Sequence, residues 1–155
     1  MISFNNAEHA AQIAAAARVP IGPADVSISY SVDGVLRGGV IYHNFTGASI
    51  EMHQAAFSKH WITRDMLWVC FHYPFAKLGV KKVFGLTPSS NPKVIELNKK
   101  LGFTIETVVG EVFPDGDLVV MSMKRDDCRW LKIEPRAFEW SVKSSNGKKQ
   151  SSAAA

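Results

Sequence analysis

The chain has 155 residues, of which 46% are hydrophobic and 21% charged, so it can bury an ordinary core and is not a wholly disordered protein. Three of its four net positive charges come from Lys143, Lys148 and Lys149, so its basicity is weak evidence for nucleic-acid binding. No run of about 18 apolar residues occurs, which excludes a membrane-spanning helix.

Residues 1–140 are expected to form a single domain. Residues 141–155 contain no large apolar side chain after Val142 and are expected to be a flexible basic tail. The opening residues MISFNNAEHA lack the charged leader and apolar run of a cleaved signal peptide. Cys70 and Cys128 form no metal-binding spacing and no disulfide framework, which is typical of reduced thiols in a cytoplasmic protein.

The first half of the chain is predicted to be a helix followed by three strands. The alanine-rich helix runs from Glu8 to Val19 and ends at Pro20. Short turns separate three runs that are typical of strands, so we expect an antiparallel meander. The expected strands are Val26–Tyr30, Val35–Phe45 and Ala48–Phe57.

The second half alternates between helices and strands. Apolar residues recur at helical spacing from Thr63 to Leu78, where Pro74 should kink or end the regular helix. A second helix is predicted with Asn91 as its N-cap, Pro92 at its first position and Gly102 after its end. The remaining expected strands are Val80–Thr87, Phe103–Phe113 and Leu118–Lys124.

This order of elements predicts the fold class. A strand, a helix and a further strand imply a parallel crossover, whereas the meander and the final hairpin are antiparallel. We therefore expect an α/β (α+β) fold whose mixed, mostly antiparallel sheet carries helices on both faces.

The segment Leu78 to Leu131 combines several features in a fixed order. A strand is followed by Asn91 at a helix start, by Lys100-Leu101-Gly102-Phe103 and by a hairpin with Asp115-Gly116. This combination resembles the C-terminal half of the GCN5-related N-acetyltransferases (GNAT), particularly the branch that acetylates the N-termini of ribosomal proteins. With the meander and first crossover helix, the resemblance covers residues 24–131. The end at Cys128–Leu131 is similar to that of short members encoded by bacteriophages.

The resemblance implies acetyl-CoA as cosubstrate, with its pyrophosphate on a glycine-containing loop that opens the first crossover helix. Here that loop is residues 58–64, with Lys59 and Trp61 in place of glycine or alanine. One interpretation is that the helix N-terminus still offers N–H groups while Lys59 and Arg64 attract phosphate. The other is that the pocket has been lost. The cofactor-binding residues predicted are Lys59, Trp61, Ile62, Thr63, Arg64, Asn91 and Asn98.

Amine acetylation needs a proton acceptor, because an alkyl ammonium has a pKa of about 10. In the strand Ala48–Phe57, a period of two places Ser49, Glu51, His53 and Ala55 on one face, and Ile50, Met52 and Gln54 on the other. Glu51, acting through water, and His53 are therefore the candidate bases. The alternative is that both belong to a solvated strand face.

The resemblance also implies a tyrosine seven residues after the helix-starting asparagine, as general acid to the leaving thiolate. That position is Asn98, which can donate a hydrogen bond but cannot act as an acid. Asn98 is then a candidate for orienting the sulfur, and Asn91 for a cofactor contact. The alternatives are a polar residue beside the apolar stripe for Asn98 and an N-cap for Asn91.

The function expected is transfer of an acetyl group from acetyl-CoA to an amine, by direct attack in a ternary complex. The acceptor is a protein N-terminus, a lysine or a small amine. The histidines form no metal-ligand pair, so no metal is expected. Because family members often pair, a homodimer is a further expectation. The alternative is a non-catalytic GNAT-like domain that binds a protein partner, such as one in a phage particle or in the host cytoplasm.

Overall fold

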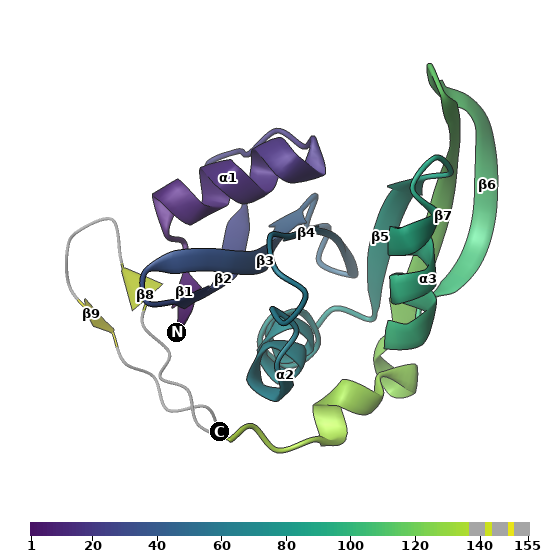
Figure 1. Cartoon of the computed structure of the whole chain (residues 1–155). Coiled ribbons are helices and arrows are strands. Elements are labelled where there is room, and N and C mark those ends of the chain that lie inside the picture. The colour runs from purple at the N-terminus through teal and green to yellow at the C-terminus, as the bar shows by residue number, and fades with distance from the viewer. Residues whose placement is uncertain (137–141, 144–148, 151–155) are drawn as a thin grey trace. The chain divides into compact units, whose positions relative to one another are not determined.

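A computed structural model describes residues 1–136, 142–143 and 149–150 (Figure 1). The chain forms two compact units that interleave in sequence. Unit 1 comprises Met1–His43, His53–Cys70 and the described residues from Lys132 onward. Unit 2 comprises Asn44–Met52 and Phe71–Leu131. One strand, one α-helix and the 3-10 turn Arg129–Lys132 are each divided between the two units. The single domain predicted for residues 1–140 stays a prediction.

Unit 1 is built on an antiparallel arrangement of β1, β2 and β3. β1 pairs with β2, and β2 pairs with β3 from Val26↔Tyr42 to Val32↔Val35, with a register shift after Tyr30. Beyond His53, β4 lies next to β3, and the backbone N–H of Phe57 donates to Arg37 O at 2.9 Å. The elements are β1 (Ile2–Phe4), α1 (Ala7–Ala17), β2 (Val26–Val32), β3 (Val35–His43), the end of β4 (Ser49–Ala56) and most of α2 (Arg64–His72).

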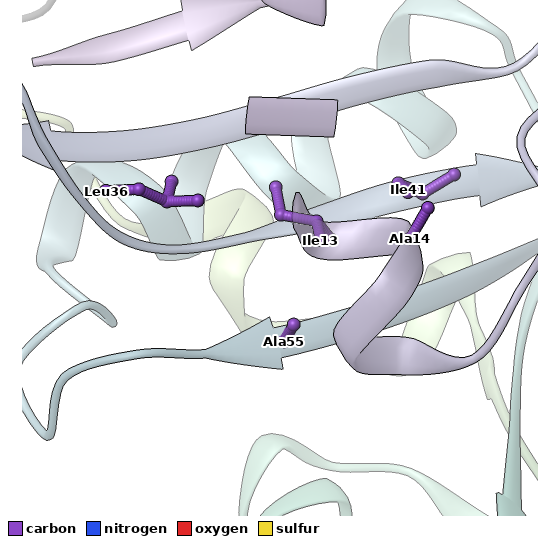
Figure 2. Packing of buried hydrophobic residues seen from close by; sticks show 5 residues of the cluster. All are labelled: Ile13, Ala14, Leu36, Ile41 and Ala55. Atoms are coloured by element: carbon purple, nitrogen blue, oxygen red, sulfur yellow. The ribbon is translucent and has the colours of Figure 1, made fainter. Parts of the chain in front are cut away.

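Helix α1 closes one core of unit 1. Its first turn is capped by Asn6, whose side chain accepts a hydrogen bond from His9 N, and it ends at Arg18 in the left-handed conformation. A buried cluster lies between this helix and the strands (Figure 2). The cluster consists of Ile13, Ala14, Leu36, Ile41 and Ala55. Burial of this apolar face, rather than helix propensity alone, stabilises so short a helix.

Unit 2 has the strand order β6-β7-β5-β4, with β4 represented by its first residues. β4 pairs in parallel with β5 from Ser49↔Lys82 to Glu51↔Phe84, whereas β5/β7 and β6/β7 are antiparallel. The remaining elements are β5 (Lys82–Pro88), α3 (Pro92–Leu101), β6 (Thr104–Phe113), β7 (Gly116–Lys124) and two 3-10 turns at Arg125–Asp127 and Arg129–Lys132. The parallel crossover predicted from the sequence is confirmed.

The two ends of α3 are formed as predicted. Asn91 Oδ1 accepts a hydrogen bond from Val94 N, and Gly102 follows α3 with a φ of 111°. Only glycine adopts that conformation without strain. The carbonyls at the end of α3 are also bound by side chains, since Arg129 donates to Lys100 O and Trp130 Nε1 donates to Leu101 O at 2.8 Å.

Pro74 ends the regular part of α2, as predicted. α2 ends at His72, and Tyr73–Lys77 continue as one turn of π-helix, in which Leu78 N donates to Tyr73 O at 3.0 Å. Proline has no N–H to donate to the preceding turn, so the wider turn carries the chain past it.

The predicted fold class is confirmed as a mixed, mostly antiparallel sheet with helices. The strand β1, which is only three residues long, was not predicted. Within the predicted tail, β8 (Val142–Lys143) pairs with β1 and β9 (Lys149–Gln150) pairs with β8, while residues 141, 144–148 and 151–155 lie outside the described residues. No helix in the described part of the chain is long and apolar enough to cross a membrane.

Candidate functional site

The loop before α2 lies in unit 1, where Thr63 caps the helix. Thr63 Oγ1 accepts a hydrogen bond from Met66 N at 3.2 Å, and Thr63 O accepts the first helical hydrogen bond, from Leu67 N at 2.9 Å. The N–H groups of Arg64 and Asp65 therefore precede the first helical hydrogen bond. Lys59 and Arg64 are exposed and Ile62 is half-buried. The loop thus presents a capped helix N-terminus flanked by two cations.

Trp61 is a packing residue of this loop. Its side chain is 5% exposed, and its indole lies against Gly38 of β3, where an added Cβ would be 2.5 Å from Cγ and Cδ2. Where the resemblance implies a flexible glycine or alanine, this loop has a tryptophan whose ring is packed on β3. The indole is therefore buried against Gly38, and a ligand in this loop would meet the backbone of Trp61 rather than its ring.

A second segment of unit 1 contacts the first turn of α2. Arg64 Nε donates to Glu134 O at 2.6 Å, and the backbone N–H of Arg136 donates to Asp65 Oδ1 at 2.5 Å. The carboxylate of Asp65 places a negative charge in the first turn, where the helix dipole stabilises it. A phosphate bound at this turn would lie near the Asp65 carboxylate and next to residues 134–136, which already contact the turn.

The two candidate bases belong to different units. Glu51 lies at the start of β4 in unit 2, where it accepts a hydrogen bond from Asn44 Nδ2 at 3.0 Å. The alternation predicted for β4 holds from Ser49 to His53, with Ile50 and Met52 buried between half-buried polar residues. Ala55 continues this alternation, but it is buried against α1 instead of being half-exposed like His53.

His53 lies in unit 1 next to a pair of residues that were not among the predicted site residues. The His43 ring is 6.3 Å from the His53 ring, centroid to centroid, in an edge-on arrangement. His43 Nδ1 lies 2.8 Å from Asp25 Oδ1 and 2.9 Å from Asp25 Oδ2. The signal was the strand pairing Val26↔Tyr42, which places Asp25 opposite His43. Counting residue pairs outward from the turn does not give this pairing, because the register shifts after Tyr30.

Asn91 and Asn98 both belong to α3 and its cap in unit 2. Asn91 is exposed and caps the helix, so the capping alternative describes it well. Asn98 is 4% exposed and faces β5, where a Cβ added to Gly85 would be 3.4 Å from its Nδ2. The structure thus brings the loop residues and His53 into unit 1, and the two asparagines and Glu51 into unit 2.

The cysteines have the character of core residues. Burial raises the pKa of the Cys70 thiol to about 12, partly offset by a hydrogen bond with Tyr42. Burial likewise raises the pKa of Cys128. Neither thiol is therefore suited to form a covalent acyl intermediate. No group of three or more His, Cys, Asp or Glu side chains that could hold a metal ion is found among the described residues.

Comparison with solved structures finds the same fold in N-acetyltransferases. A chimera of spermidine N-acetyltransferase SpeG from Vibrio cholerae with hSSAT aligns with a TM-score of 0.57 and 21% identity, covering 70% of this chain and 71% of that one. SpeG from Vibrio cholerae in complex with CoA and spermine aligns with a TM-score of 0.56 and 22% identity, covering 68% of each chain. No protein-family model matches the sequence, and no curated protein shows a match to it. This likeness shows a GNAT fold, as the sequence predicted.

Proposed function

We propose that this protein is an acetyl-CoA-dependent N-acetyltransferase that acts on an amine. The observation that carries the proposal is the capped N-terminus of α2, flanked by Lys59 and Arg64, on a fold shared with N-acetyltransferases. A helix N-terminus with nearby cations is suited to bind the pyrophosphate of CoA.

The residues of the loop fit this cosubstrate through charge and backbone rather than through glycine. The Arg64 bond to Glu134 O uses Nε, so the two Nη groups carry the donors proposed for phosphate. Lys59 adds an exposed positive charge, and the backbone of Trp61, Ile62 and Thr63 lines the turn. In this proposal Asn91 contacts the cofactor, and Asn98 orients the sulfur with water supplying the proton.

The reaction requires a neutral amine beside the thioester. The candidate acceptors of the ammonium proton are Glu51, through water, and His53. The amine then attacks the carbonyl carbon, the C–S bond breaks, and the thiolate leaves as CoA after taking a proton. Since burial keeps the Cys70 thiol protonated, we propose direct transfer in a ternary complex.

The acceptor is proposed as a small amine, a lysine or a protein N-terminus. SpeG, which shares the fold, was solved with spermine, which supports including polyamines among the acceptors to be tested. The resemblance to the ribosomal-protein branch keeps protein N-termini in the same set. A phage origin, a cytoplasmic location and pairing into a homodimer remain predictions.

A non-catalytic role is the second candidate, and a specific observation favours it. The backbone of residues 134–136 and the Asp65 carboxylate occupy the first turn of α2, where a phosphate would bind. With that position taken, the fold would serve to bind a protein partner instead.

Acetylation assays test the proposal directly. The purified chain should release CoA from acetyl-CoA in the presence of one or more of spermidine, a lysine peptide and peptides with free N-termini. Mass spectrometry should find a gain of one acetyl group on the acceptor. Absence of transfer to every acceptor, with no binding of acetyl-CoA, would contradict the proposal and favour the partner-binding role.

A further inference from the structure

Asp25 and His43 form a polar pair at one end of the β2/β3 ladder in unit 1. The Asp25 side chain is 8% exposed and that of His43 is 27% exposed. Besides His43 Nδ1, the Asp25 carboxylate accepts a hydrogen bond from Gly22 N at 2.7 Å through Oδ2. A buried carboxylate with two donors is held firmly in place.

This geometry fixes the tautomer of His43. Because the carboxylate accepts from Nδ1, Nδ1 carries the proton and Nε2 of the neutral ring is left as the acceptor. When Nε2 takes a proton, the imidazolium that forms lies against a carboxylate that stabilises it. A carboxylate behind an imidazole is the arrangement that makes a histidine an effective general base.

The pair also lies beside a residue already proposed for the reaction. Within unit 1, Asp25, which precedes β2, and His53 of β4 are ionisable groups that face the His43 ring. Part of His43 reaches solvent, since 27% of its side chain is exposed. His43 thus combines a bound carboxylate with an accessible ring, which are the two properties that a proton acceptor for an incoming ammonium requires.

We infer that Asp25 and His43 form the proton-accepting pair of the transfer, an inference that rests on the proposed function. His43 Nε2 takes the proton that the acceptor ammonium releases, and the nitrogen lone pair then attacks the thioester carbonyl. The C–S bond breaks, the thiolate takes a proton from water, the nitrogen releases its second proton to that water, and His43 returns the first proton to solvent. Asp25 is the positioning residue that holds Nδ1–H and stabilises the imidazolium.

The test compares four single variants in the acetylation assay. His43→Gln removes the acceptor nitrogen, and Asp25→Asn keeps the shape but lets an amide donate to Nδ1, which moves the ring proton to Nε2. Each should lower kcat by about 10²–10⁴-fold and remove the acidic limb of the kcat/KM profile against pH. His53→Gln should cost less. His9→Gln is the matched control, because His9 bonds Ser29 Oγ at 2.8 Å elsewhere in unit 1.

The outcomes separate the inference from the proposed function. If the wild-type protein transfers acetyl groups while His43→Gln and Asp25→Asn keep its rate and pH profile, the inference is wrong and the proposed function stands. The inference is equally wrong if the large loss occurs only in His53→Gln. If both variants have a lower Tm but an unchanged kcat, the pair only stabilises the conformation of residues 22–25 and is not a base.

Two further results complete the test. Should His43→Gln fail to fold, His43→Ala with added imidazole replaces it, and rescue of the rate is expected. Lack of rescue in a folded His43→Ala protein would count against the inference. Absence of transfer in the wild type overturns the proposed function and the inference together.

Discussion

The contact of Trp61 with Gly38 allows a sharp prediction about the loop before α2. In Gly38→Ala, the new Cβ would lie 2.5 Å from Cγ and Cδ2 of the indole and 2.8 Å from its Cβ. The ring is buried, so it cannot turn aside into solvent. Overpacking of this kind costs about 1–3 kcal/mol of the free energy of unfolding, which corresponds to a fall in Tm of about 2–12 °C for a chain of this size.

The assay is thermal or urea unfolding followed by circular dichroism, with a partner variant that relieves the clash. Trp61→Ala removes Cγ and Cδ2, so Gly38→Ala combined with Trp61→Ala should be more stable than the sum of the two single changes by at least about 0.5 kcal/mol. Gly110→Ala is the control, because the nearest atom to its new Cβ is 3.8 Å away, and it should change stability by no more than about 0.5 kcal/mol. Strictly additive single changes, or a Gly38→Ala variant as stable as the wild type, would refute the packing of Trp61 on β3.

Three further predictions concern charge and burial. Both Cys70 and Cys128 should resist alkylation at pH 8 in the folded protein and react rapidly in urea, as measured by mass spectrometry, since burial raises both pKa values; rapid labelling of the native protein would contradict their burial. The hydrogen bond from Lys82 lowers the pKa of Glu106. The ionised Glu106 carboxylate therefore stabilises the folded state at pH values above its ordinary pKa, and this stabilisation is lost as the pH falls through the lowered pKa. Carboxyl NMR titration of Lys82→Met should therefore show the Glu106 midpoint moving upward, and an unmoved midpoint would show that the pair does not form. Asp65→Asn should tighten acetyl-CoA binding about 2–5-fold, as measured by calorimetry. The substitution removes a negative charge from the proposed phosphate position, where one charge changes the binding free energy by about 0.3–1 kcal/mol. Weaker binding would place the phosphate elsewhere.

Helices and turns were predicted from the sequence because single residues determine their ends. Asn91, Pro92 and Gly102 fix α3 through a cap, a locked φ and a left-handed conformation that other residues resist. Pro74 likewise marks where α2 loses its regular hydrogen bonds. These are local effects, so a single sequence contains them.

Features that depend on partners distant in the chain were not predicted. β1 has three residues and is defined by its pairing with β2, which no local pattern announces. Ala55 follows the alternation of β4, but its burial comes from α1, which the strand pattern alone does not predict.

The candidate site shows the same limit. The chain segment 58–64 was placed at the start of α2 from its sequence, but the contacts of Arg64 and Asp65 with residues 134–136 span about seventy positions and left no sequence signal. The pairing of Asp25 with His43 depends on a β-ladder whose register shifts once, which a count along the strands does not recover.

Calorimetric titration with acetyl-CoA tests the central claim most directly. The wild-type chain should bind in the micromolar range, and the double variant Lys59→Ala/Arg64→Ala should bind at least tenfold more weakly, since it lacks both cations at the start of α2. The control Lys93→Ala removes an exposed lysine from α3 and should leave the affinity unchanged. No heat and no thermal stabilisation at millimolar acetyl-CoA would contradict the transferase account.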